Sequence, residues 1–283
     1  MTIEIRPAQS WVDYLACEEI QRQVWRAHDN RDIVPASLLV TAAKNGGVLL
    51  CAFHGEEIVG FVFGFLGMEP GVSQWHFKHC SHMLAVLQAY RAQRVGINLK
   101  LRQRQVLLAQ GLDLATWTYD PLQAVNARLN LSRLGAIARR YVRDAYGEMS
   151  DELNAGVASD RFEAEWWVSS ARVETRLAPD FSSIVTLSQA PAIYDIEFDW
   201  HNLPHVTAEQ GLATESIWLE IPANFNLLRA QDLGLACAWR ARTRATLEKA
   251  FANGYIAVDF MNWRDDLGQD RAAYLLQKSD PPV

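Results

Sequence analysis

The stretch that decides the fold is HMLAVLQAYRAQRVGINLKLRQRQ, residues 82 to 105. Its first part alternates as a strand does, and its last part has the apolar spacing of a helix. A short loop from Arg91 to Gly96, with one glycine and two arginines, joins the two parts. Such a loop can bind an anion, because the first N–H groups of a helix have no partner within it. The alternative is an ordinary turn beside a solvated basic helix.

The composition indicates a soluble globular protein of one large domain or two smaller ones. The chain has 283 residues, of which 49% are hydrophobic and 21% charged, as is usual for a protein with a full core. The net charge of -6 argues against a general nucleic-acid-binding surface. No apolar run reaches the roughly 18 residues of a membrane span, and the N-terminus does not look like a signal peptide. We therefore expect a cytoplasmic protein with no nucleic-acid or membrane partner.

The four cysteines, Cys17, Cys51, Cys80 and Cys237, are widely spaced along the chain. They form no Cys-x-x-Cys pair and no zinc pattern, so the sequence predicts no metal site. We expect them to be reduced, buried thiols, as is usual in a cytosolic protein.

Hydrophobic periodicity predicts a mixed α/β fold for the first part of the chain. The expected strands cover residues 3–8, 46–67 (a hairpin), 76–87, 112–120 and 162–168, and the expected helices cover 11–28, 94–110 and 121–135. This order is typical of a mixed sheet with βαβ crossovers. We expect one domain at residues 1–170.

The remainder, residues 171–283, is expected to form a smaller strand-helix-strand block. Its first part, to about residue 216, is mostly irregular, and strands at 216–222, 255–263 and 272–278 then flank a helix at 229–252. Since no clear sequence repeat is present, any duplication of the first domain is only topological. The block could represent half of such a domain.

The helix expected at 94–110 carries two apolar stripes. One consists of Val95, Leu99 and Val106, and the other, on nearly the opposite side, of Ile97, Leu101 and Leu108. A surface helix shows a single stripe, so we expect the sheet to cover one side and another body the other. Either the C-terminal block or the second subunit of a homodimer could cover that other side.

Residues 86–99 resemble motif A of the GNAT superfamily of N-acetyltransferases. The family pattern is Val-x-Pro-x-Tyr-Arg-Gly-x-Gly-Ile-Gly-x-x-Leu, and the matching residues are Val86, Tyr90, Arg91, Gly96 and Leu99. The element order of residues 1–170 is similar too. The chain looks closest to a subgroup of predicted acetyltransferases with a C-terminal extension. Its family-like stretches stand here at 81–86, 116–123 and 130–135.

This resemblance implies a GNAT-like domain that takes acetyl-CoA or another acyl-CoA as cosubstrate. The strand at 82–86 would splay from residues 112–119 and pair with the pantetheine arm, and the loop would hold the pyrophosphate. The implied cofactor-binding residues are Leu84, Val86, Arg91, Ala92, Gln93, Arg94, Val95, Gly96 and Asn126. Arg94 stands where the family usually has its first motif glycine.

N-acyl transfer requires a base for the amine, stabilisation of the oxyanion and a proton for the departing thiolate. His82 is our candidate base, with a structural histidine as the alternative. Alternation along the strand puts it on one face with Cys80, Leu84 and Val86.

For the general acid, the resemblance implies a tyrosine on the helix after the next strand. Leu131 takes that position here. Tyr119 is a candidate acid in its place, with Tyr141, Tyr146 or solvent as alternatives.

Three charged residues are candidate substrate ligands. Glu165, on an expected strand face, could bind the acceptor amine or lie on the wet face. Arg240 and Arg244 share an apolar helix face and need an anionic partner. That partner is either a carboxylate elsewhere in the chain, forming a salt bridge between domains, or a carboxylate of the acceptor or acyl group. Asp120, before Pro121, is expected to cap the helix that follows.

The resemblance therefore implies an acyl-CoA-dependent N-acyltransferase that acts on a small amine or amino acid. The block at 171–283 would cover the acceptor side. The alternative from another class is a non-catalytic acyl-CoA-binding module with a regulatory or structural role.

Overall fold

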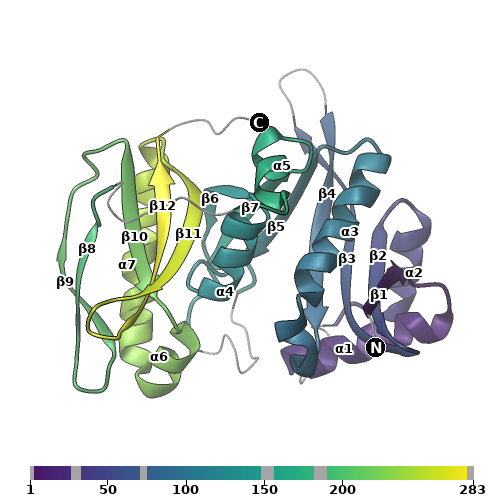
Figure 1. Ribbon diagram of the computed structural model, residues 1–283, viewed down its shortest axis with the longest axis horizontal. Coiled ribbons are helices and arrows are strands. Elements are labelled where there is room, and N and C mark those ends of the chain that lie inside the picture. Colours follow the sequence, from purple (N-terminus) through teal and green to yellow (C-terminus); the bar gives the residue numbers. More distant parts are fainter. Residues whose placement is uncertain (1–2, 27–32, 71–74, 148–155, 182–189, 279–283) are drawn as a thin grey trace. The chain divides into compact units, whose positions relative to one another are not determined.

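The computed structural model describes residues 3–26, 33–70, 75–147, 156–181 and 190–278 (Figure 1). The chain forms two compact units. Unit 1 comprises Met1–Trp117, Asp151–Leu153 and Trp167–Ser169, and unit 2 comprises Thr118–Ser150, Asn154–Trp166 and Ser170–Val283. This division differs from the expected boundary at residue 170, because Ala138 pairs with Ala257 in a neighbouring strand.

Unit 1 contains a mixed sheet, as the sequence predicted. Its elements are β1 (Ile3–Pro7), α1 (Trp11–Trp25), α2 (Ala36–Lys44), β2 (Val48–His54), β3 (Glu57–Pro70), β4 (Trp75–Val86), the 3-10 helix η2 (Gln88–Gln93), α3 (Val95–Ala109) and β5 (Leu114–Tyr119), whose last two residues belong to unit 2. The strand order is β1-β2-β3-β4-β5. Neighbours are antiparallel except β4 and β5, which are parallel because α3 crosses between them.

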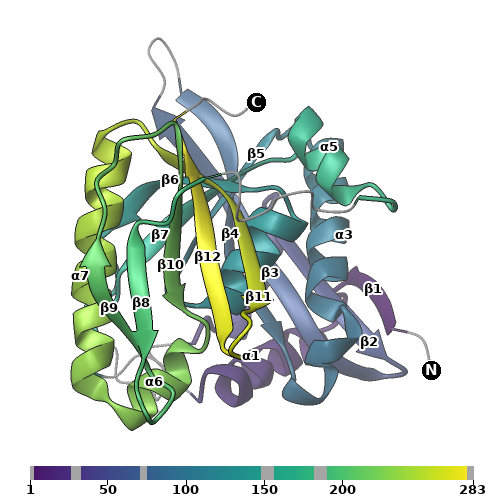
Figure 2. The ribbon, with the colours of Figure 1, turned by 60° about the vertical axis from the view of Figure 1, so that its left-hand side comes forward.

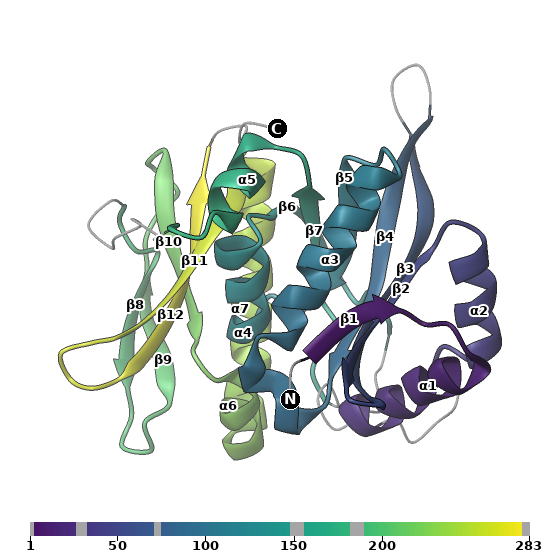
Figure 3. The same cartoon turned by 45° about the vertical axis from the view of Figure 1, so that its right-hand side comes forward.

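Helices cover both faces of this sheet. Figure 3 shows α1 and α2 on one face and α3 on the other. The core under α1 and α2 includes Cys17, Leu39, Phe61 and Phe63, all almost fully buried. The Cys17 and Cys51 thiols meet there at 3.4 Å. Cys80 is only partly buried and Cys237 is exposed, contrary to the expectation of four buried thiols.

Helix α3 begins and ends close to its expected bounds, and Gly111 follows it in the left-handed conformation, at φ 73°. The buried side chains of α3 are Val95, Leu99, Lys100, Gln103 and Leu107. The expected stripe through Val106 is therefore wrong, because two polar side chains lie on the buried face.

Unit 2 contains the second group of elements. They are α4 (Ala124–Ala127), the π-helix η3 (Arg128–Arg133), β6 (Ile137–Val142), β7 (Arg161–Trp167, whose last residue belongs to unit 1), α5 (Ala171–Leu177), β8 (Tyr194–Phe198), β9 (Pro204–Glu209), β10 (Ser216–Pro222), α6 (Phe225–Gln231), α7 (Leu233–Ala252), β11 (Ile256–Arg264) and β12 (Asp270–Gln277). Its larger sheet has the order β7-β6-β11-β12-β10, and β8 and β9 form a separate hairpin (Figure 2).

The order of elements from β5 onwards contains a topological repeat. Strand β10 is followed by helices and then by the antiparallel pair β11 and β12, as β5 is followed by α4 and then by the antiparallel pair β6 and β7. The two pairs meet edge to edge at Ala138 and Ala257. The arrangement agrees with the expectation that any duplication is topological.

Several elements differ from the sequence prediction. The elements α2, β6, α5, β8 and β9 were not predicted, and the last three lie within the segment expected to be irregular. The helix expected at 229–252 is two helices, because Asp232 accepts a hydrogen bond from the Leu235 N–H and starts α7. Residues 27–28 of the first expected helix lie outside the described residues. In the described ranges, no helix is both long and apolar enough to cross a bilayer.

Candidate functional site

Strands β4 and β5 of unit 1 separate soon after they meet. In the described residues their parallel pairing consists of His79 with Ala115 and Cys80 with Thr116. Strand β4 then continues to Val86. We call the region between β4 and β5 beyond these pairs the split. A backbone edge without a neighbouring strand can pair with an extended ligand that carries amide groups.

A β-bulge at His82 turns β4 at the entrance to the split. Phe63 of β3 pairs with Met83, and the next residue, Gly64, pairs with Ser81, so His82 has no opposite residue. Because a bulge reverses the alternation of side chains, the expectation that Cys80, His82, Leu84 and Val86 share one face is wrong.

Contacts of the side chains before and after the bulge show which face of the sheet each one occupies. His79 and Ser81 bond to α3, and Leu84 and Val86 approach Gly96 at the start of α3. His82 instead contacts Phe63, which belongs to the core on the opposite face of the sheet.

The His82 ring is accessible and packs against aromatic neighbours. Its centroid lies 6.2 Å from that of Phe63 and 5.9 Å from that of Phe65. Burial of part of the ring lowers the pKa of His82, so the neutral imidazole, which can accept a proton, is favoured at pH 7.

The loop after β4 is a short 3-10 turn that leads into α3. Arg94 takes the left-handed conformation, with φ 60° and ψ 15°. It therefore adopts the backbone conformation that glycine favours, although this conformation costs a residue with a Cβ some free energy. The Asn98 N–H bonds to the Arg94 carbonyl, and the first N–H groups of α3 have no partner inside the helix.

Two arginines place positive charge at the start of α3. Arg91 donates through Nε to the Val86 carbonyl at 3.2 Å, which holds it at the end of β4. Arg91, Gln93 and Arg94 are all exposed. The predicted cofactor residues of unit 1 therefore lie along one path, from Leu84 and Val86 through the loop to Gly96.

A buried polar cluster behind the split was missed by the sequence analysis. It consists of His79 and Ser81 of β4 and Lys100 and Gln103 of α3, which are at most 6% exposed. The signal in the sequence was the position of Lys100 directly beside Leu99, on the same side as Gln103 and Leu107.

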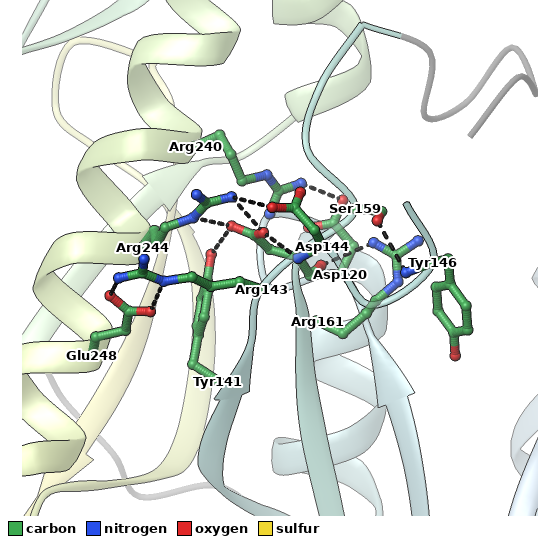
Figure 4. Close-up of polar contacts among 11 residues, drawn as sticks. Asp120, Tyr141, Arg143, Asp144, Tyr146, Ser159, Arg161, Arg240, Arg244 and Glu248 are labelled. Carbon is green, nitrogen blue, oxygen red and sulfur yellow. Dashed lines mark hydrogen bonds and ion pairs between the residues drawn. The ribbon is translucent and has the colours of Figure 1, made fainter. Parts of the chain in front are cut away.

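Unit 2 holds Arg240 and Arg244 in a network of ion pairs (Figure 4). Arg240 donates to Asp120 at 2.7 Å, and both side chains are nearly buried. Arg244 makes two hydrogen bonds to Asp160, at 2.6 and 2.7 Å. The partners are thus carboxylates of the chain itself, but all four residues belong to unit 2, so these pairs do not join two domains as the first alternative expected. A role in binding substrate stays a prediction.

Further contacts fix the orientation of this network. Tyr141 donates a hydrogen bond to Asp160 at 2.7 Å. The pKa of Tyr141 is raised, mainly by burial and also by this hydrogen bond. Burial alone would raise the pKa of Asp160, but the bonds from Arg244 and Tyr141 lower it. Asp120 accepts from the Leu122 N–H and bonds to Arg240, and α4 begins only at Ala124. Its expected role as a helix cap is therefore wrong.

The other predicted residues of unit 2 occupy different surroundings. Tyr119 is buried, and burial raises its pKa, which makes it a weaker acid. Asn126 is exposed on α4. Glu165 of β7 forms an ion pair with Arg139 at 3.1 Å. Leu131, which takes the position of the family tyrosine, is fully buried. The roles assigned to Tyr119, Asn126 and Glu165 stay predictions.

No protein-family model matches the chain, and no curated protein matches its sequence. Solved structures do match. An acetyltransferase of the GNAT family from Streptococcus pneumoniae is 15% identical, with 58% of this chain and 98% of that chain covered and a TM-score of 0.46. The ribosomal-protein-S18-alanine N-acetyltransferase from Escherichia coli is 13% identical, with 64% and 100% covered and a TM-score of 0.45. NAA60 from Arabidopsis thaliana, solved with acetyl-CoA, is 16% identical, with 59% and 99% covered and a TM-score of 0.47. Structures of the family that the motif at residues 86–99 resembles are thus among those similar to this chain.

Proposed function

We propose that the chain is an acyl-CoA-dependent N-acyltransferase whose acceptor is a small amine or amino acid. The observation that carries the proposal is the split between β4 and β5, whose edge strand leads directly into the cationic start of α3. An extended amide-bearing arm fits the first feature, and a phosphate group fits the second.

The cosubstrate would lie along β4 with its phosphates at the loop. The N–H groups of Val95 and Gly96 and the guanidinium groups of Arg91 and Arg94 would hold the pyrophosphate, since arginine suits phosphate by charge and by geometry. The pantetheine amides would pair with the edge of β4 beside Leu84 and Val86. The thioester would then reach the bulge at His82.

The reaction itself needs few protein groups in this arrangement. The acceptor nitrogen attacks the thioester carbon and loses a proton to His82, and the C–S bond breaks to release the thiolate. Leu131 supplies no acidic proton, so the thiolate would take its proton from solvent. The cytoplasmic location expected from the sequence belongs to the same proposal.

The second candidate is an acyl-CoA-binding module that performs no transfer. The buried Leu131, in the position of the family tyrosine, favours it. Both candidates require the same binding site, so they differ in turnover alone.

Calorimetric binding of CoA and acetyl-CoA tests the shared site, and thiol release with a panel of amines and amino acids separates the two candidates. Arg91→Ala should weaken CoA binding roughly tenfold, by the loss of a charged hydrogen bond. Arg102→Ala, which removes an exposed arginine from α3 away from the loop, is the matched control. Binding without thiol release would favour the module, and an unchanged affinity in Arg91→Ala would remove the phosphate site.

A further inference from the structure

A groove in unit 1 lies between helix α1 and the start of β3, and its volume is about 280 Å³. One wall is the face of α1 from Val12 to Gln23, which is about 17 Å long because a helix rises about 1.5 Å per residue. The opposite wall is formed by residues 56–58, which we call the hairpin wall. Leu87 completes the lining, and its N–H bonds to the Val59 carbonyl beside the hairpin wall.

The groove has an apolar lining. It consists of Val12, Ala16 and Ile20 of α1, Ile58 of β3 and Leu87. Val12 is 71% exposed, and Trp11 and Leu15, in the same two turns of α1, are also exposed. Large apolar side chains gathered at one place on a protein surface commonly mark a site where another molecule binds.

The charged side chains of the groove are all acidic. Asp13 and Glu19 come from α1, and Glu56 and Glu57 come from the hairpin wall. Among the described residues that line the groove there is no lysine, arginine or histidine. Carboxylates therefore stand on both walls, and a positively charged ligand would be attracted from both sides.

The carboxylates of the hairpin wall are the ones free to bind. Asp13 already accepts hydrogen bonds from two N–H groups at the start of α1, and Glu19 lies 3.4 Å from Arg22. Glu56 and Glu57 are exposed, and neither side chain forms an ion pair or a hydrogen bond with any described residue. A ligand can reach both of them without displacing an existing bond.

A basic peptide that also carries apolar side chains matches both properties of the groove. About five extended residues span the length of the α1 wall. Lysine or arginine side chains would meet the carboxylates, while an apolar side chain would cover Val12 and enter the lining. A polyamine or an inorganic cation would match the charge and leave Val12 exposed to water.

We propose that this groove docks a basic segment with apolar side chains from a partner protein. The inference goes beyond acyl transfer and does not depend on it, because none of the groove residues is among the predicted cofactor residues. Its acidic walls would give specificity and its apolar lining would contribute affinity.

Fluorescence anisotropy with three short labelled peptides tests the proposal on the full chain. The first peptide alternates lysine and leucine, the second has serine in place of each leucine, and the third has glutamate in place of each lysine. Wild-type protein should bind the lysine–leucine peptide about tenfold or more tighter than either of the others. Added salt should weaken this binding, because the charges are exposed.

Variants locate the binding site. Glu56→Gln combined with Glu57→Gln alters two exposed side chains and should weaken binding of the lysine–leucine peptide about three- to tenfold. Val12→Ser should weaken it through the loss of apolar contact. Asp113→Asn combined with Asp266→Asn removes the same charge from exposed positions outside the groove and should keep the affinity within about twofold.

Three outcomes would overturn the proposal. If wild-type protein binds the lysine–serine peptide as tightly as the lysine–leucine peptide, the apolar lining plays no part. If the combined change of Glu56 and Glu57 leaves the affinity unchanged, the peptide binds elsewhere. The third outcome is that none of the peptides binds. Since no measurement involves acyl-CoA, failure of the proposed function would leave these results unaffected.

Discussion

Arg240 of α7 donates a 2.7 Å hydrogen bond to Asp120, a residue 120 positions earlier in the chain, and both side chains are almost fully buried. Two further nitrogens of Arg240 are buried without a hydrogen-bond partner in the described residues. The Asp120 carboxylate therefore carries most of the compensation for this buried charge.

Removal of Asp120 should destabilise the protein strongly. Asp120→Ala leaves the Arg240 charge buried and uncompensated, a change that costs about 3–5 kcal/mol in comparable cases. Urea unfolding measures the loss. Asp270→Ala breaks an exposed ion pair with Arg264 and should cost less than about 1 kcal/mol. Equal losses of unfolding free energy in the two variants would show that the buried ion pair stabilises the protein no more than the exposed one.

Gly64 should tolerate no side chain. A Cβ atom there would overlap the His79 ring and the Cys80 carbonyl, so Gly64→Ala should lower the free energy of unfolding by about 1–3 kcal/mol through overpacking. Gly211→Ala is the control, because a Cβ at that position meets open space. A Gly64→Ala protein as stable as wild type would contradict the position of His79 against β3.

Replacing Arg94 by glycine should stabilise the protein and weaken its binding of CoA. Since its left-handed conformation costs a non-glycine residue about 1–2 kcal/mol, Arg94→Gly should raise the free energy of unfolding by about 1 kcal/mol. It should also weaken CoA binding, because a cation is lost at the loop. Arg102→Gly, inside α3, should instead lower stability by about 1 kcal/mol. Thermal unfolding and calorimetry give both values, and a destabilised Arg94→Gly protein would be the contrary result.

The stability of the protein should rise with pH above neutrality because of Lys100. Burial lowers its pKa in the folded protein to about 7, against about 10.4 in an unfolded chain. Between these values the unfolded chain binds more protons, so the free energy of unfolding increases with pH, by at most about 1.4 kcal/mol per unit. His79, which faces Lys100, has a pKa of about 3 and is neutral throughout this range.

Urea unfolding of wild-type and Lys100→Met protein at pH 7, 8 and 9 isolates this contribution, because tyrosine and cysteine ionisation affect both proteins alike. The free energy of unfolding of wild type minus that of Lys100→Met should increase as the pH rises. Parallel curves would mean that Lys100 keeps its charge in the folded state.

Local patterns in the sequence predicted much of unit 1. The bounds of α3 follow from apolar spacing and from Gly111, and the hairpin of β2 and β3 follows from the turn at residues 54–57. The bulge at His82 could not be predicted, since it depends on the register in which β4 pairs with β3. Its effect on the site is large, because it moves Leu84 and Val86 to the face opposite His82.

The candidate site was predictable only where it is local in sequence. The loop from Arg91 to Gly96 is contiguous, so its motif was visible. Lys100 looked like part of a solvated basic helix, because its burial depends on Ser81 and Trp117 from two other strands. The partners of Arg240 and Arg244 were likewise out of reach, since only tertiary contacts bring Asp120 and Asp160 to them.

Amide hydrogen exchange with and without saturating acetyl-CoA tests the central claim, that an acyl-CoA lies in the split with its phosphates at the start of α3. Our account predicts slower exchange in residues 82–99, where β4 gains a neighbour and the first N–H groups of α3 gain acceptors. Unchanged exchange throughout residues 82–99 at millimolar acetyl-CoA would contradict it.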